Sequence, residues 1–272
     1  MSGTDAADSN ATRRTQVYGA IIVVGGGCYG GYYVRQLQRA ARAQAITARE
    51  IIVVDRDSEC AVARTLAAGD GQPIPTRVVV AEWSAFFEDY LERAAANADA
   101  ATGDAIVPSP LMPHLMGDWL VARARARWPD RDVRVAPFDR LPAVPWERAG
   151  DAGTHYVSFA TWMCPINCIE PRICPHTRDE RSWSIPDVLR VHAAAETDAG
   201  RLLVVAAMHC RHRAYGVGMF DTSEVLDADR AIAAGAANRE LDVIVGTASH
   251  CHGALTRLVI GASSSVVRSH VG

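Results

Sequence analysis

The chain has 272 residues, of which 49% are hydrophobic and 22% are charged, so it is long and apolar enough to bury a large core. Its formal charge of −3 provides no field to attract nucleic acid or an anionic membrane surface, and we therefore expect a small-molecule ligand. All 28 basic residues are arginine, and the absence of lysine excludes Schiff-base enzymes, pyridoxal-phosphate enzymes and Walker-type nucleotide sites.

The chain also indicates a compartment. Its first 16 residues are polar, and no apolar run reaches the ~20 residues needed to cross a bilayer, so we expect a loose N-terminal tail and no membrane span. Seven cysteines, an odd number, do not indicate a disulfide framework. The cytoplasm is the expected location, and the cysteines are candidates for thiolate chemistry or metal binding.

The N-terminal half alternates between strand and helix patterns. An apolar run at 17–25 predicts a buried strand, and the helical spacing of Tyr33, Leu37 and Ala41 predicts the helix that follows. A strand at 50–54 completes a βαβ unit. The later elements expected in this half are a strand at 77–80, an amphipathic helix at 83–94, a short strand at 105–107 and a helix at 115–126.

The C-terminal half continues the alternation after residues 129–153, a connecting stretch with four prolines and one expected strand at 133–136. We expect a strand at 155–161, a Cys- and Pro-rich loop, a helix starting near Ser184, a strand at 201–208, a helix at 223–237 and a strand at 241–248. These elements predict a doubly wound, mostly parallel α/β sheet. Its expected parts are a disordered tail (1–16), a Rossmann-type dinucleotide-binding half (17–150) and an α/β half with the Cys/His clusters (151–272).

A glycine motif follows the first predicted strand. Gly25, Gly27 and Gly30 satisfy G-x-G-x-x-G, in which the glycines allow a tight turn, close approach of a pyrophosphate and close helix–strand packing. Asp55, at the tip of the second strand, is placed to accept hydrogen bonds from a ribose 2′-OH, which favours NAD. Arg56 beside it could meet a 2′-phosphate, so NADP stays open. A glycine-rich turn without a ligand is the alternative.

The same segment carries a family resemblance. Residues 19–70, through the run Val53-Val54-Asp55-Arg56-Asp57, resemble the nucleotide-binding domain of the TrkA-N (RCK) type and Rossmann dehydrogenases generally. The resemblance covers about a fifth of the chain. It implies NAD(H) or a related adenine nucleotide at the three motif glycines and Asp55, and it does not separate an enzyme from a ligand-gated regulator.

A Pro-rich loop carries three thiols and one imidazole within 13 residues: Cys164, Cys168, Cys174 and His176. Three thiolates suit an iron–sulfur cluster, with His176, Cys210 or Cys251 as a fourth ligand or with one iron left open for substrate. The same residues would give a zinc ion a Cys3His site. The Cys-x3-Cys-x5-Cys spacing matches neither a zinc ribbon nor a ferredoxin, and small buried thiols are the alternative.

Two more clusters follow predicted strands: His209-Cys210-Arg211-His212 and His250-Cys251-His252. In a parallel sheet the carboxyl ends of the strands share one edge with the glycine loop, so we expect Cys164, His209 and His250 to converge beside the nucleotide. His209, His250 and His114, which follows the fourth strand, are the candidate acids or bases. Hydrogen-bonded core or rim histidines are the alternative.

Together these patterns predict an NAD(H)-binding redox enzyme with a Cys-ligated metal or iron–sulfur site next to the nicotinamide. The alternative is a non-catalytic NAD(H)-binding regulator, or a redox or metal sensor with a metal-pinned loop. The expected partners are a small-molecule substrate and either a second copy of the chain or a redox partner protein, with no nucleic acid and no membrane.

Overall fold

The computed structural model describes residues 15–69, 71–198 and 202–262. The expected N-terminal tail lies outside the described residues except for Thr15 and Gln16, and Gln16 already belongs to the first strand. The elements follow in the order β1 (Gln16–Val24), α1 (Cys28–Arg42), β2 (Ile46–Asp55), α2 (Ala61–Ala67), β3 (Thr76–Val80), α3 (Trp83–Ala96), η1 (Ala98–Ala101), β4 (Ala105–Val107), α4 (Leu115–Arg127), β5 (Val133–Ala136), β6 (Trp146–Ala149), η2 (Asp151–Gly153), β7 (Thr154–Ser158), α5 (Ile185–Asp198), β8 (Leu203–His209), β9 (Arg211–Ala214), β10 (Val217–Asp221), α6 (Thr222–Ala236), β11 (Leu241–Ala248) and β12 (His252–Ile260).

The first sheet has the strand order β3-β2-β1-β4-β10-β9. Its first four strands are parallel, and β10 and β9 complete it as an antiparallel pair. The central strand β1 is buried from Ala20 to Val24, as expected for an apolar strand covered on both faces. The order β3-β2-β1-β4 is that of half a doubly wound sheet, in which ligands bind beyond the carboxyl ends of the strands.

The second sheet has the order β6-β7-β12-β11-β8, and β5 also pairs with β12. Only β8 and β11 pair in parallel; the other pairings of this sheet are antiparallel. The α/β class is therefore confirmed, but the strands are divided between two sheets instead of continuing one. The predicted boundary at residue 150 falls between β6 and β7, which are paired neighbours in the second sheet, whereas β9 and β10 return to the first.

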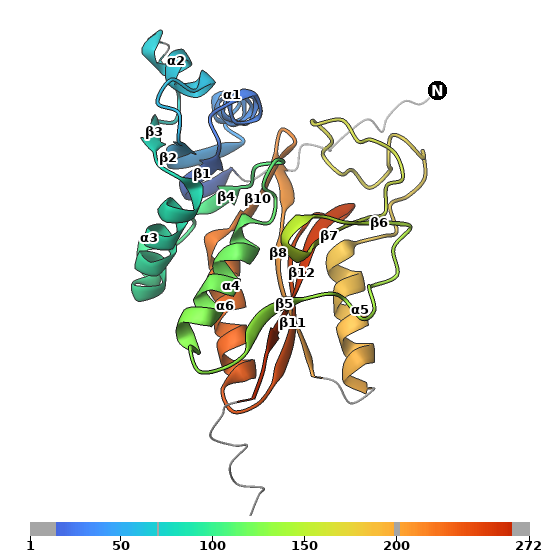
Figure 1. Cartoon of the computed structure of the whole chain (residues 1–272). Coiled ribbons are helices and arrows are strands. Elements are labelled where there is room, and N and C mark those ends of the chain that lie inside the picture. Colours follow the sequence, from blue (N-terminus) through green and yellow to red (C-terminus); the bar gives the residue numbers. More distant parts are fainter. Residues whose placement is uncertain (1–14, 70, 199–201, 263–272) are drawn as a thin grey trace, which may run out of the picture.

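Helices fill the space between the sheets and cover their outer faces (Figure 1). Helix α1 packs through Leu37 on one face of the first sheet, and α3, α4 and α6 share a core with the other face and with the second sheet. Helix α5 packs through Leu189 on the remaining face of the second sheet. Among the helices in the described part of the chain, none combines the length and the apolar character needed to cross a membrane.

A tight hairpin that the sequence patterns did not predict joins β9 to β10. Its two central residues, Tyr215 and Gly216, have φ angles of 48° and 80°, the left-handed backbone that a two-residue hairpin turn requires. Tyr-Gly is a weak signal for such a turn compared with Asn-Gly. The hairpin pairs β10 with β4. Because β9 follows β8 after a single residue, the chain passes here from the second sheet to the first.

Candidate functional site

The glycine loop lies between β1 and α1. Gly25 has a φ of 87°, and a Cβ at Gly30 would lie 1.8 Å from the Gly25 carbonyl oxygen, so the turn and the helix pack without room for a side chain. Gly27 caps the start of α1, and a Cβ there would meet nothing within 4 Å. The loop is closed at Gly30 and open at Gly27, the arrangement expected when a ligand lies against the second glycine.

Asp55 at the end of β2 faces this loop. Its carboxylate accepts hydrogen bonds from the backbone N–H groups of Gly26 at 2.6 Å and Asp57 at 2.9 Å. The indole of Trp83 donates to the Val54 carbonyl at 2.9 Å and lies 3.4 Å from where a Cβ on Gly25 would be. Trp83 therefore packs beside the turn, a role that its helical periodicity alone does not indicate.

The carboxyl ends of β7, β8 and β11 lie at one edge of the second sheet. Strand β12 is antiparallel to both β7 and β11, and β8 is parallel to β11, so the three strands run in the same direction. The pairs Ala248–His209 and His252–Ser158 place the strand ends in register. The segments that follow these strands share one edge, as expected, and we call this region the Cys/His edge. The edge belongs to the second sheet, whereas the glycine loop follows β1 of the first sheet, so the prediction that all of them lie at the edge of one sheet is wrong.

Two of the predicted catalytic histidines meet at the Cys/His edge. The rings of His209 and His250 pack edge to face with their centroids 4.7 Å apart. Burial lowers the pKa of His209 to about 4, with a further contribution from Arg211, and burial lowers the pKa of His250 as well. The buried Nε2 of His209 has no hydrogen-bond partner within the described structure. Both imidazoles are therefore neutral at pH 7, and His209 presents an unused ring nitrogen.

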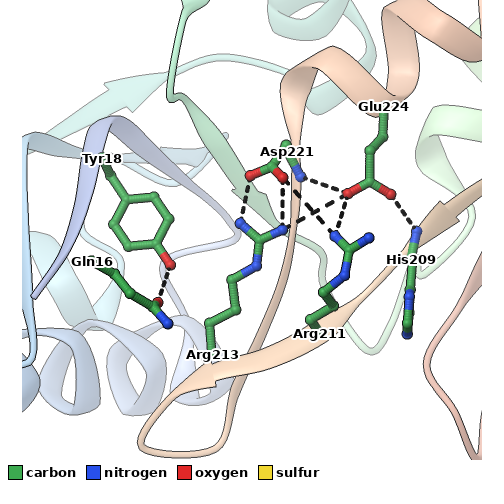
Figure 2. A network of polar contacts seen from close by, with 7 residues as sticks. All are labelled: Gln16, Tyr18, His209, Arg211, Arg213, Asp221 and Glu224. Carbon is green, nitrogen blue, oxygen red and sulfur yellow. Dashed lines mark hydrogen bonds and ion pairs between the residues drawn. The ribbon is translucent and has the colours of Figure 1, made fainter. Parts of the chain in front are cut away.

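His209 is held from the first sheet by an ionic network around the start of α6 (Figure 2). Glu224 accepts a hydrogen bond from the backbone N–H of His209 at 2.8 Å and pairs with Arg211 at 2.7 Å. Asp221 binds Arg213 through both carboxylate oxygens, and this pairing lowers the pKa of Asp221. Asp221 and Glu224 also form the capping box of α6, so the network joins the helix start to the end of β8.

Glu170 ties the Cys-rich loop to the Cys/His edge. Its carboxylate accepts hydrogen bonds from the Ser249 hydroxyl at 2.6 Å and from the backbone N–H groups of Cys251 at 3.1 Å and His250 at 3.2 Å. Arg181 lies 4.0 Å away. Burial alone would raise the pKa of this carboxyl, but these donors lower it below its ordinary value. The sequence did not indicate this role of Glu170, because its partners lie about 80 positions further along the chain.

The thiols of the predicted metal site differ in environment. Backbone N–H groups of Thr177 and His176 lower the pKa of Cys174, whereas burial and the nearby Cys168 raise the pKa of Cys164. The ring of His176 stacks on Trp162, with centroids 4.4 Å apart. Within the described ranges, no three His, Cys, Asp or Glu side chains are grouped closely enough to hold a metal ion. The metal site stays a prediction.

Cys210 and Cys251, the other predicted ligands, are thiols shielded by protein. Burial raises the pKa of each to about 12, so both are protonated at neutral pH. The indole N–H of Trp183 lies 3.3 Å from the sulfur of Cys251 and donates to it. Each of the two cysteines directly follows one of the paired histidines in the sequence.

His114 lies at the start of α4, in a different environment from the histidine pair. It is 5% exposed, neither ring nitrogen has a partner in the described structure, and the ring packs over Gly117, where an added Cβ would lie 2.3 Å from Nε2. Burial lowers its pKa to about 4. A buried, neutral imidazole here serves packing, and its predicted role as an acid or base stays untested.

The Cys-rich loop also reaches the first sheet. A Cβ on Gly216, in the β9–β10 hairpin, would lie 3.0 Å from the carbonyl oxygen of Asn167. The loop therefore packs directly against a turn whose strands belong to the same sheet as the glycine loop. This contact joins the Cys-rich loop to the sheet that carries the glycine loop.

Comparison with family models gives a match in the C-terminal part of the chain. Residues 116–261 match the model of the family AF_1314_C, described as "Uncharacterized protein, C-terminal domain". The matched segment contains the whole Cys/His edge and the β9–β10 hairpin, and it excludes the glycine loop. No curated protein and no solved structure matches the chain.

Proposed function

The chain belongs to the AF_1314_C family, and we propose that it is an NAD(H)-dependent oxidoreductase that binds the nucleotide at the glycine loop and reacts its substrate at the Cys/His edge. The observation that carries the proposal is the open space at Gly27 beside the closed packing at Gly30. The space at Gly27 would accept a side chain in the free protein, so packing does not explain the glycine. A ligand that fills this space does explain it.

The start of α1 and the position of Asp55 support nucleotide binding at the glycine loop. The glycine loop starts α1, whose free N–H groups favour a pyrophosphate, and no acidic residue lies in the first turn of the helix. Asp55 is fixed at the loop by two backbone N–H groups, and each of its oxygens can accept a further hydrogen bond from a ribose hydroxyl. These residues would hold the adenosine diphosphate part of the nucleotide.

The Cys/His edge supplies a base. NAD⁺, when bound, provides a hydride acceptor, so an alcohol substrate that loses a hydride from carbon must also lose its hydroxyl proton to a base. Burial lowers the pKa of His250, so its imidazole is neutral at pH 7 and a ring nitrogen can accept this proton. His209 would fix the ring of His250 by edge-to-face contact. The products are the carbonyl compound, the reduced nucleotide and a protonated His250.

The seven free thiols bear on the cellular compartment of the protein. None of the seven cysteines, all within the described residues, forms a disulfide, and Cys28 is exposed as a free thiol. Free thiols persist in a reducing compartment. These thiols support our proposal that the oxidoreductase acts in the cytoplasm.

The test is an NADH titration of the full chain and of Gly27→Ala, followed by nucleotide fluorescence. The added methyl group meets nothing in the free protein but would occupy the ligand space, so we expect the affinity to fall at least about tenfold, or 1.4 kcal/mol, with an unchanged melting temperature. Gly71→Ala is the matched control, because an added Cβ there also meets nothing within 4 Å. Equal affinity in wild type and Gly27→Ala would remove the assignment, and binding without any turnover would favour a regulator or sensor.

A further inference from the structure

One face of the second sheet carries a row of polar and aromatic side chains next to the Cys/His edge. Trp146, Ser158 and His252 are paired across β6, β7 and β12, and Arg148 pairs with Tyr156 two positions along. Residues two positions apart on a strand point to the same face, so these five side chains share one face. The opposite face packs on α5 through Val157 and Leu189.

A cavity of about 440 Å³ lies over this row. Pro110, in the loop that follows β4, lines it together with the five side chains, so the cavity lies between the first sheet's carboxyl edge and the second sheet. Its volume is within the range of small-molecule sites. Of the residues in the His250–His252 cluster, it is His252 that lines the cavity.

The cavity has a defined electrostatic character. Among the described residues that line it, Arg148 is the charged side chain at neutral pH, with no acidic residue beside it. Neither a hydrogen bond nor an ion pair joins its guanidinium to another described residue, and the side chain is exposed. An unpaired guanidinium presents parallel N–H donors that fit a carboxylate in a bidentate pair.

The remaining lining residues favour a flat ligand. Trp146 is 41% exposed and stands in the same row as the Ser158–His252 pair, whose hydroxyl and Nδ1 atoms are 3.0 Å apart. Tyr156 is the cross-strand partner of Arg148. Trp146 on the same strand and Tyr156 on the neighbouring strand provide ring surfaces next to Arg148, and the hydroxyl–imidazole pair provides one polar end.

We propose that this cavity binds a small molecule that combines a flat unsaturated ring with one carboxylate, the carboxylate on Arg148 and the ring between Trp146 and Tyr156. A single arginine balances one negative charge, which favours a carboxylate over a phosphate dianion. The proposal stands on the residues that line this cavity and goes beyond the proposed oxidoreductase function.

The experiment measures binding of benzoate to the full chain by calorimetry, with no nucleotide present. We expect benzoate to bind the wild type and to bind Arg148→Gln at least about tenfold more weakly, because the charge-assisted pair is lost. Benzamide, a neutral molecule of the same shape, should bind wild type about as weakly as benzoate binds the variant. Arg134→Gln is the matched control, since Arg134 is an exposed arginine of β5 in the same sheet and pairs with Asp132.

No binding of benzoate to the wild type would overturn the proposal, and so would equal binding to the wild type and Arg148→Gln. Equal losses in Arg148→Gln and Arg134→Gln would also overturn it, because the effect would then be one of net charge. The result is independent of NADH binding. Failure of the Gly27→Ala test would remove the oxidoreductase and leave a carboxylate-binding cavity, whereas failure here leaves the nucleotide assignment intact.

Discussion

The glycine loop is held by main-chain packing, whereas the Cys/His edge is held by side chains that come from segments far apart in the sequence. At the loop, Gly30 lies against the Gly25 carbonyl and leaves no room for a side chain. At the edge, Glu170 and Glu224 bind the backbone of His250 and His209. The glycine loop depends on having no side chain at Gly30, so an added methyl group should disrupt it. The Cys/His edge depends on charged side chains, so removal of a charge should disrupt it.

The largest expected effect concerns the three thiols of the Cys-rich loop. If Cys164, Cys168 and Cys174 share one metal or cluster, anaerobically purified protein will contain stoichiometric iron or zinc, and each single Ser replacement will lose most of it. Metal analysis beside an absorption spectrum measures this. Cys28→Ser, which changes an exposed thiol outside the loop, should keep the metal. Wild-type protein that contains no metal and titrates seven thiols when unfolded would refute the metal site.

The next effect tests the main-chain packing of the glycine loop. Gly30→Ala places a methyl group 1.8 Å from a backbone oxygen, which cannot move aside as a flexible side chain would. We expect the free energy of unfolding to fall by about 3 kcal/mol or more, although alanine favours a helix over glycine by about 1 kcal/mol. Chemical denaturation of Gly30→Ala beside Gly27→Ala measures the difference. Equal stability of the two variants would contradict the packing described for Gly30.

Glu170→Gln tests the side-chain anchor of the edge. The replacement keeps the shape but removes the charge that three donors and Arg181 bind, and we expect a loss of about 2 kcal/mol at pH 7. Glu180→Gln, in the same loop, should change stability by less than about 0.5 kcal/mol, because Glu180 and its partner Arg172 are both exposed.

The pH dependence of this variant has a definite sign. The folded pKa of Glu170 lies below its ordinary value of about 4.3, so the stabilisation is complete above that value and is lost as the pH falls through the folded pKa. Wild type and Glu170→Gln should therefore differ at pH 7 and converge at the acid end of a denaturation series. A constant difference across the series would show that the charge of Glu170 contributes nothing.

His114→Leu should have the smallest effect at neutral pH. It replaces an unpartnered buried imidazole with an apolar group of similar size, and we expect a change within about 1 kcal/mol at pH 7. The wild type should lose stability as the pH falls from 6.5 towards 4, because the unfolded chain binds a proton that the buried ring rejects. The variant lacks this loss and should be more stable by roughly 3 kcal/mol near pH 4. Parallel curves for both proteins would contradict the buried, neutral state.

Local sequence patterns predicted the elements better than their assembly. The apolar runs of β1 and β11 and the periodicity of α3 depend on neighbours in sequence, and these elements are present close to their expected positions. The division into two sheets depends on which strand edges pair, and no run of residues specifies its partner. Strand β12 was also not predicted, because it begins within the His250–His252 cluster, whose polar residues resemble a site more than the start of a strand.

In the candidate site, too, local features could be predicted and long-range contacts could not. The glycine motif and the shared edge of Cys164, His209 and His250 could be predicted, because motif spacing and strand direction are local properties combined with one rule of topology. Glu170, Arg181 and Trp183 could not, since their roles exist only after the Cys-rich loop folds onto the turn between β11 and β12. Arg148 belongs to the same class, because β6 was not predicted as a strand.

The central claim, that a nucleotide at the glycine loop works with the histidines of the Cys/His edge, is tested most directly by NMR of the imidazole resonances during an NADH titration. His209→Gln and His250→Gln identify the two resonances. The account predicts that both resonances shift in proportion to bound NADH in the wild type and stay unchanged in Gly27→Ala. Saturation of the wild type with NADH while both resonances keep their positions would contradict it.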